Sequence, residues 1–286
     1  MRKIAKWATL ILIVGLLFAG IGALMGGVNS VTFDHGFRIV RNGTITHKLG
    51  QVKQLNLDVT DTDVELVAGQ QASVTVSGPE VKATKVNLSA GILTISRNSS
   101  LPSFGFDFVS NHQPHVKIVL PQKTLAQLDL NLNSGDLSIQ QVAAKTATIT
   151  LGSGDMTVNQ LSVTNQGEFK NNSGDIDLSH VTLNKVTGQL NSGELSIDNS
   201  TLTEFNATNN SGDTDIEHTK LSGIIGLTNH SGDVELNNSD TTGYRLKADS
   251  GDISVHDAEH SSPYNQEPNA ADRLEITSAS GDIDIE

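Results

Sequence analysis

The sequence predicts an all-β chain: a single-stranded β-solenoid (β-helix) of coils about 19–20 residues long, preceded by one N-terminal transmembrane helix. Three observations lead to this fold class. A Ser-Gly-Asp tripeptide recurs at nearly constant spacing, apolar and polar residues alternate after each copy, and residues 7–28 contain no charge. Internal repetition with a period of this length is typical of stacked-repeat architectures.

The first element is the uncharged stretch 7–28, which follows the basic residues Arg2, Lys3 and Lys6. Its 22 residues suffice to cross the hydrocarbon core, which needs about 20 helical residues. The positive-inside rule then predicts a cytoplasmic segment 1–6, a transmembrane anchor 7–28 and an extracellular remainder of a single-pass membrane protein. A cleaved signal peptide is the alternative, although its apolar region is usually shorter.

Composition narrows the classes of function. The chain carries 19 Lys and Arg against 32 Asp and Glu, a net charge of −13, which disfavours nucleic-acid binding. It has no cysteine, which excludes disulfides, thiolate metal sites and thiol catalysis. Only 4% of its residues are aromatic, so small aliphatic side chains must fill the core.

The regular repeat occupies residues 126–286. Successive repeat glycines are separated by 19, 20, 19, 19, 20, 19 and 30 residues, and the last gap contains a polar insertion at about 256–272. These glycines are predicted to turn the chain at one corner of every coil, because glycine adopts positive φ readily: Gly135, Gly154, Gly174, Gly193, Gly212, Gly232, Gly251 and Gly281.

Two columns of aliphatic residues follow the tripeptide, separated by a polar column. The first runs from Leu137 to Ile283, the second from Ile139 to Ile285, and Ser138 begins the polar one. Such alternation predicts strands with one buried face. A unit this short cannot bury that face alone, so stacked coils must share a continuous interior.

The acidic position of the tripeptide has two interpretations. Serine and aspartate can cap backbone amides at the turn, beside an asparagine ladder at Asn133, Asn172, Asn191 and Asn210. Alternatively, acids stacked about one strand spacing apart repel one another, and calcium could relieve this. The cation candidates are Asp136, Asp155, Asp175, Glu194, Asp213, Asp233 and Asp252. No other cofactor is predicted.

Residues 29–125 are predicted to form less regular β coils and a cap. Residues 61–66 mirror the later repeat around Gly232, and residues 89–95 repeat it less faithfully. The Ser-, Pro- and Phe-containing stretch 99–114 is typical of a loop or cap. The last strand, 282–286, has no evident cap, and its alternating acids can deter edge pairing, with a homodimer through that end as the alternative.

A family resemblance follows from these motifs. The segment Val116-Lys117-Ile118-Val119-Leu120-Pro121, then residues 128–139 (LDLNLNSGDLSI) and their serial repeats, resemble the bacterial family of domains of unknown function labelled "putative adhesins", over roughly residues 50–286. The resemblance implies a β-solenoid in Gram-positive envelope proteins, some linked to the stress response to antibiotics that interact with lipid II. It implies no catalytic residue.

The sequence contains no motif of serine hydrolases, zinc proteases or phosphate-binding loops. His112 and His115 flank Pro114 and are interpreted as structural. The stacked carboxylates resemble glycosidase pairs in spacing, but a uniform row lacks the raised-pKa partner of an acid–base pair. The sequence therefore predicts a non-enzymatic, adhesin-like surface scaffold that binds a cell-wall polymer or envelope protein. An accessory regulator of envelope-stress signalling and a polysaccharide-active enzyme are the alternatives.

Overall fold

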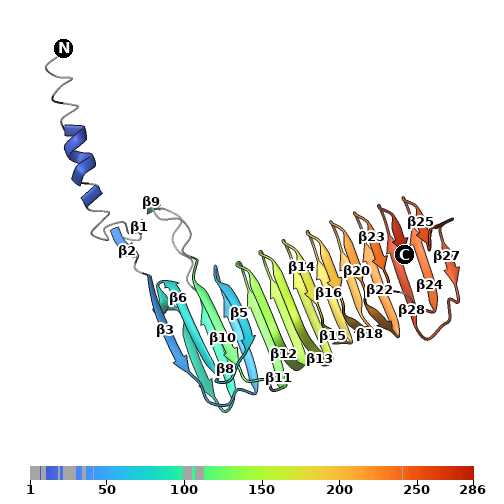
Figure 1. Cartoon of the computed structure of the whole chain (residues 1–286), viewed down its shortest axis with the longest axis horizontal. Coiled ribbons are helices and arrows are strands. Elements are labelled where there is room, and N and C mark those ends of the chain that lie inside the picture. The colour runs from blue at the N-terminus through green and yellow to red at the C-terminus, as the bar shows by residue number, and fades with distance from the viewer. Residues whose placement is uncertain are drawn as a thin grey trace.

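The computed structural model describes residues 7, 11–18, 20–21, 30–33, 37–40, 42–98, 105–106, 113–239 and 241–286. Over residues 42–286 the described chain forms a long stack of coils, with strands running side by side along its length (Figure 1). The predicted all-β solenoid is confirmed. Each regular coil contributes one strand to each of three ladders, which we number in the order in which the chain passes through them after Ser-Gly-Asp.

In the regular coils, ladder 1 contains the strands that follow the Ser-Gly-Asp corner. In spatial order it comprises β3 (Asn42–Lys48), β6 (Ser73–Pro79), β10 (His115–Leu120), β5 (Asp63–Ala68), the start of β12 (Leu137–Leu151), the start of β13 (Met156–Asn171), β14 (Ile176–Ser179), β17 (Leu195–Asp198), β20 (Thr214–Glu217), β23 (Val234–Asn237), β29 (Ile283–Ile285), β25 (Ile253–Val255) and β26 (Ala258–His260).

Ladder 2 is short and joins the middles of β12 and β13 to β15 (Thr182–Asn184), β18 (Thr201–Thr203) and β21 (Lys220–Ser222). Ladder 3 precedes the next corner and comprises β7 (Lys85–Ser89), β8 (Ile92–Arg97), β4 (Gln54–Val59), β11 (Leu125–Leu132), the ends of β12 and β13, β16 (Val186–Leu190), β19 (Asn206–Asn209), β22 (Ile224–Asn229), β28 (Arg273–Ser278), β24 (Gly243–Ala248) and β27 (Tyr264–Gln266).

The interior is built from the predicted columns. Leu137 lies opposite Met156 and Ile139 opposite Val158 in parallel register, and all four side chains are buried. Burying each such aliphatic side chain contributes about 1.5–3 kcal/mol. A third column of mostly apolar residues precedes the corner, and Gly188 occupies one of its positions without a side chain. The ring of Phe205 lies within van der Waals distance of the position that a methyl group on this glycine would occupy. A glycine at this position leaves space for the neighbouring aromatic ring in the narrow interior.

The C-terminal end differs from the prediction. The coil that contains β28 and β29 does not follow β24 and β25 in space but lies between them and the coil of β22 and β23. Residues 243–255 therefore form the last regular coil of the stack in space. The chain then continues through the insertion, and its final coil lies one step further in. Strands β26 and β27 of that insertion pair antiparallel with β25 and β24. The final strand β29 is thus internal, and the expectation of an uncapped C-terminal strand was wrong.

The N-terminal end has the same arrangement. The coil of β4 and β5 lies between β8 and β10 on one side and the coil of β11 and β12 on the other, although β8 and β10 come later in the chain than β4 and β5. The predicted match of residues 61–66 to the repeat is confirmed, because Val64 lies opposite Leu137 and Leu66 opposite Ile139. Residues 89–95 instead form the hairpin between β7 and β8, so their assignment to the repeat was wrong.

A buried arginine closes this end. Arg97 is 0% exposed and donates hydrogen bonds to the carbonyl oxygens of Pro79 and Glu80 and to Thr84 Oγ1, which fixes the 3₁₀ turn η1 (Val81–Ala83) against the last coil. Three acceptors offset part of the desolvation of a buried guanidinium.

The N-terminal part adds a small sheet of β1 (Ser30–Phe33), β2 (Phe37–Val40) and β9 (Gly105–Phe106). The predicted loop 99–114 lies mostly outside the described residues, as does much of the predicted anchor 7–28, in which residues 7, 11–18 and 20–21 are helical. Among the residues that the structure describes, no helix has both the length and the apolar character needed to span a bilayer, so the predicted transmembrane helix is not found.

Candidate functional site

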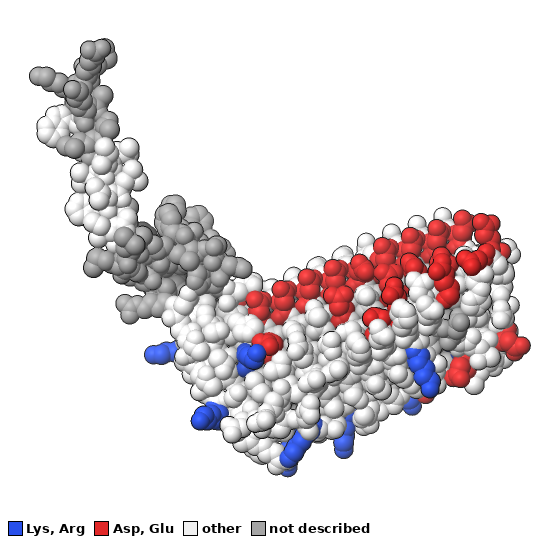
Figure 2. Space-filling view, viewed as in Figure 1, with Lys and Arg blue, Asp and Glu red and all other residues white. Residues whose placement is uncertain are grey.

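The acidic position of Ser-Gly-Asp forms a continuous row along one edge of the solenoid, between ladder 3 and ladder 1. Figure 2 shows Asp and Glu gathered along this edge. We call this row the acidic ridge; in spatial order it consists of Asp63, Asp136, Asp155, Asp175, Glu194, Asp213, Asp233, Asp282 and Asp252. All seven predicted cation candidates therefore lie together, with Asp63 added at one end and Asp282 inserted between Asp233 and Asp252.

Hydrogen bonds to the backbone hold the aspartates of the ridge. In every ridge aspartate except the terminal Asp252, Oδ1 accepts the backbone N–H of the acidic residue in the next coil, at 3.1 Å for Asp136 to Asp155 and 2.8 Å for Asp213 to Asp233. Such charge-assisted bonds tie neighbouring coils together. The aspartates therefore make inter-coil bonds that offset part of their mutual repulsion, while calcium binding by their other oxygens stays a prediction.

The glycine of the corner has a steric role. All eight repeat glycines have positive φ, between 116° and 140°. A Cβ on Gly212 would overlap the carbonyl oxygen of Gly193 in the preceding coil, and the same overlap recurs along the corner. Each glycine therefore permits both the turn and the close stacking of one corner on the next.

The ridge changes at Glu194, the only Glu in the row. Among the described hydrogen bonds, none joins its carboxylate to the backbone N–H of Asp213; it interacts instead with the Asp215 carboxyl group on β20, and the two share a hydrogen bond when one of them is protonated. Burial, that hydrogen bond and the charges of Glu194, Glu235 and Asp213 raise the pKa of Asp215 to about 6. Burial and nearby carboxylates also raise the pKa of Asp177. The expectation of a uniform row without a raised-pKa partner was therefore wrong.

Buried asparagines support the same corner from inside the coil. Asn209 is 1% exposed, and its Nδ2 donates to the carbonyl oxygens of Gly193, Gly212 and Asp213 at 3.0–3.1 Å. Asn171 and Asn229 make related bonds in their coils. The sequence pattern did not reveal these residues; it indicated the adjacent row of exposed asparagines, in which Asn210 donates to Asn191 Oδ1 at 2.9 Å.

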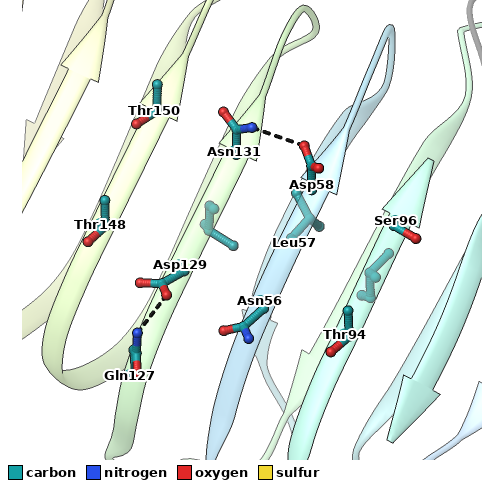
Figure 3. Close-up of a pocket in the computed structure, with 12 residues that line it drawn as sticks. Asn56, Leu57, Asp58, Thr94, Ser96, Gln127, Asp129, Asn131, Thr148 and Thr150 are labelled. Atoms are coloured by element: carbon teal, nitrogen blue, oxygen red, sulfur yellow. Dashed lines mark hydrogen bonds between the residues drawn. The ribbon is translucent and has the colours of Figure 1, made fainter. Parts of the chain in front are cut away.

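The outward face of ladder 3 contains a polar groove near the N-terminal end of the stack. Its volume is about 510 Å³, and its walls come from β8, β4, β11 and β12 (Figure 3). We call this the polar groove, and its polar lining consists of Asn56, Asp58, Thr94, Ser96, Gln127, Asp129, Asn131, Thr148 and Thr150. It falls within the size range of sites for small ligands.

The groove presents hydrogen-bonding groups in rows set by the strands. Asn131 Nδ2 donates to Asp58 Oδ1 at 2.9 Å, and Gln127 Nε2 donates to Asp129 Oδ2 at 2.6 Å, as Figure 3 shows. The Oδ1 atom of Asn56 is buried in this face and has no hydrogen-bond partner among the described residues. The lining offers hydroxyls, amides and two carboxylates, but no aromatic ring and no Lys or Arg.

A second hollow continues this surface. It has a volume of about 520 Å³, shares Thr150 with the polar groove, and extends across β13, β16 and β19. Its polar lining adds Lys170, Asn171, Asn172, Gln189, Asn191, Thr208 and Asn210. The two hollows together give ladder 3 an extended, largely uncharged polar surface, which the sequence analysis did not assign.

Of the two histidines that were interpreted as structural, the structure describes only His115. His112 lies outside the described residues, and His115 is on β10, where its Nε2 lies 3.6 Å from Glu65 Oε2. Lys117 pairs with the same carboxylate at 2.8 Å. His115 thus belongs to an ion-pair cluster on ladder 1.

A known protein family matches most of the chain. The profile of the family described as Toastrack DUF4097 matches residues 52–286. No curated protein gives a match.

Solved structures also resemble the chain. A "putative adhesin" from Bacteroides fragilis is 14% identical, with 86% of this chain and 97% of that chain covered and a TM-score of 0.49. A "putative cell adhesion protein" from Clostridium sporogenes is 15% identical over 86% and 98% of the chains, with a TM-score of 0.25. A "putative lipid binding protein" from Parabacteroides distasonis is 14% identical over 86% and 97%, with a TM-score of 0.30.

Proposed function

The chain belongs to the Toastrack DUF4097 family, and we propose that it is a non-enzymatic, adhesin-like scaffold at the bacterial cell surface that binds a hydroxyl-rich envelope polymer through ladder 3. The observation that carries the proposal is the pair of adjoining hollows, which are lined mainly by hydroxyl and amide side chains. These groups both donate and accept hydrogen bonds, as polysaccharide hydroxyls do.

The chemistry of the lining favours a polymer over a small sugar. Stacking on aromatic rings, which strengthens binding to a single sugar ring, is not offered by the groove lining. Binding must therefore rest on many modest hydrogen bonds, each of which contributes about 0.5–1.5 kcal/mol. A polymer that lies across several coils makes such contacts simultaneously and gains affinity from their number.

Membrane tethering through residues 7–28 is part of the proposal. Within the described part of this segment the large apolar side chains are exposed, including Trp7 at 66%, Ile11 at 70% and Phe18 at 71%. An exposed apolar face of this kind is stabilised by a lipid environment. With Arg2, Lys3 and Lys6 on the cytoplasmic side, the solenoid would face outward.

The acidic ridge favours a structural rather than a catalytic role. Its aspartates repeat one backbone hydrogen bond from coil to coil, whereas a catalytic pair is a local exception. Glu194 and Asp215 are such an exception, but neither lines the polar groove or its extension. No side chain among the described residues specifically favours the envelope-stress alternative.

The test compares two substitutions in one column of ladder 3. Thr150 lines both hollows, whereas Thr228 occupies the same column three strands beyond Lys170 and lines neither. The full chain in detergent and its Thr150→Lys and Thr228→Lys variants are mixed with purified insoluble cell-wall polysaccharide, and the retained fraction is measured. We expect Thr150→Lys to lose most of the retention and Thr228→Lys to keep it.

Equal retention of both variants, or no retention of the unmodified chain, would contradict polymer binding by this groove. Thermal unfolding of each variant separates a lost site from a lost fold. Release of reducing sugar by the unmodified chain, abolished by Asp215→Asn, would instead support the enzymatic alternative.

A further inference from the structure

A second cluster of ligand-type side chains lies at a different corner, between ladder 1 and ladder 2. Asp198 ends β17, Glu217 ends β20, and His218 follows it at the turn. One ligand atom from each of these residues lies within 4.8 Å of the other two. None of them belongs to the acidic ridge or lines the polar groove.

The separations suit a small tetrahedral ion. His218 Nδ1 lies 3.4 Å from Asp198 Oδ1 and 4.0 Å from Glu217 Oε2. Zinc binds nitrogen and oxygen ligands at about 2.0–2.2 Å, so two of its ligands at a tetrahedral angle lie roughly 3.3–3.6 Å apart. The Asp198–His218 pair already has this separation, and a rotation of the exposed Glu217 side chain would bring the third atom to it.

A buried oxygen on the neighbouring strand provides a further indication. Asp198 and Asn237 are the ladder neighbours of Glu217 on its two sides. The Oδ1 atom of Asn237 is buried and finds no hydrogen-bond partner among the described residues. That of Asp198 is also buried and accepts no hydrogen bond there, although His218 Nδ1 lies 3.4 Å from it. A buried oxygen without a donor is unfavourable, and a cation bound beside Glu217 would satisfy it.

The backbone positions this cluster firmly. His218 has a φ of 46°, and its N–H donates to the carbonyl oxygen of Asn237 at 2.9 Å. The side chains of Asp198, Glu217 and His218 remain 40%, 49% and 54% exposed, so an ion can reach them from solvent. The corner thus provides three accessible ligands on two adjacent coils that are held in parallel register.

We propose that Asp198, Glu217 and His218 form a binding site for a zinc-class divalent ion. An imidazole nitrogen with two carboxylates matches the ligand preference of zinc, whereas calcium takes six to eight oxygens. Three protein ligands leave one position for water or for a donor atom of a partner. Asn237 is the ladder neighbour of Glu217 on the next strand and supplies a further oxygen at this corner.

The solenoid contains a matched control. His180 occupies the same corner position two coils earlier, with a φ of 54°, and Asn199 and Asn238 occupy it in other coils with φ of 49°. Asparagine is therefore compatible with the backbone of this column. The variants His218→Asn and His180→Asn remove one imidazole each from equivalent turns.

The experiment titrates the full chain in detergent at pH 7 with zinc by calorimetry and with cobalt by visible absorption. We expect one zinc bound per chain, tetrahedral cobalt bands, and a loss of affinity of roughly tenfold or more for His218→Asn and Asp198→Asn. His180→Asn should keep zinc affinity within about twofold, because His180 is outside the cluster.

Absence of zinc binding to the unmodified chain would overturn the proposal. So would an equal loss in His218→Asn and His180→Asn, or displacement of cobalt by equimolar calcium, since both results would indicate diffuse binding to acidic side chains. Circular dichroism and thermal unfolding without metal verify that each variant is folded. A variant that does not fold is replaced by Glu217→Gln, which retains the size of the side chain and is expected to lose affinity in the same way.

Discussion

Two of the three corners in each regular coil follow different rules. At the Ser-Gly-Asp corner, glycine has φ of 116–140° and its missing Cβ admits the carbonyl oxygen of the neighbouring coil. At the corner between ladders 1 and 2, residues such as Gln141, His180 and His218 adopt φ of 46–58°. A left-handed conformation of this kind is accessible to polar residues, and their side chains remain outside the stack.

The two corners therefore differ in how far their residues can vary from coil to coil. Stacking leaves no room for a side chain at the glycine of the first corner. This glycine therefore recurs from coil to coil, and its repetition in the sequence indicates the stacked architecture. The second corner tolerates glutamine, histidine or asparagine, so single coils can acquire individual chemistry there. The proposed metal site lies at the second corner, as expected if function varies where sterics permit it.

The largest expected effect comes from adding one methyl group at the first corner. Gly212→Ala would place a Cβ against the carbonyl oxygen of Gly193 in a backbone conformation that alanine rarely adopts. Combined strain and overlap should lower the free energy of unfolding by about 3–5 kcal/mol. Chemical denaturation measures this loss.

Asn199→Gly is the control at the second corner. Glycine adopts positive φ freely, so we expect a change within about 1 kcal/mol. A comparable loss in both variants would show that the two corners do not differ as the stacking geometry requires.

A smaller effect is expected from the buried asparagines behind the first corner. Asn209→Ala removes the donor for the carbonyl oxygens of Gly193, Gly212 and Asp213, which should cost about 2–3 kcal/mol. Asn210→Ala, at the adjacent exposed position, should cost less than about 1 kcal/mol because water replaces its partner. Equal denaturation midpoints for the two variants would contradict this assignment.

The first corner and the core columns could be predicted because sterics and burial restrict them in every coil. The buried asparagines could not, because Asn209 shares its column with leucines such as Leu190 and Leu151. Either residue fits the space, so the column has no single residue type. The second corner could not be recognised from the sequence for a similar reason, because its residues share a positive φ but no single residue type.

The order of coils at the two ends was also beyond the sequence pattern. Strand register depends on which residue columns align, and the same columns align when a coil is placed one step earlier or later in the stack. The columns therefore do not determine the order of the coils. The spacing between Gly251 and Gly281 indicated an insertion. It did not indicate that β26 and β27 would cover the last coil while β28 and β29 turned back beneath it.

The smallest predicted effect concerns Asp215, which interacts with Glu194, the ridge residue whose carboxylate does not accept the backbone hydrogen bond made by its neighbours. Because the pKa of Asp215 is raised to about 6, the folded chain binds this proton more tightly than the unfolded chain does. This carboxyl therefore favours the fold increasingly as the pH falls from 7 through 6 toward 4, and opposes it as the pH rises.

Asp215→Asn should raise the melting temperature at pH 7 by a few degrees and reduce its pH dependence, with screening by solvent limiting the effect to about 1 kcal/mol. Ser196→Asn, in the same column one coil away, should leave the pH profile unchanged. If Asp215→Asn instead retains the slope of the unmodified chain between pH 4 and 7, the carboxyl pair with Glu194 does not form in solution.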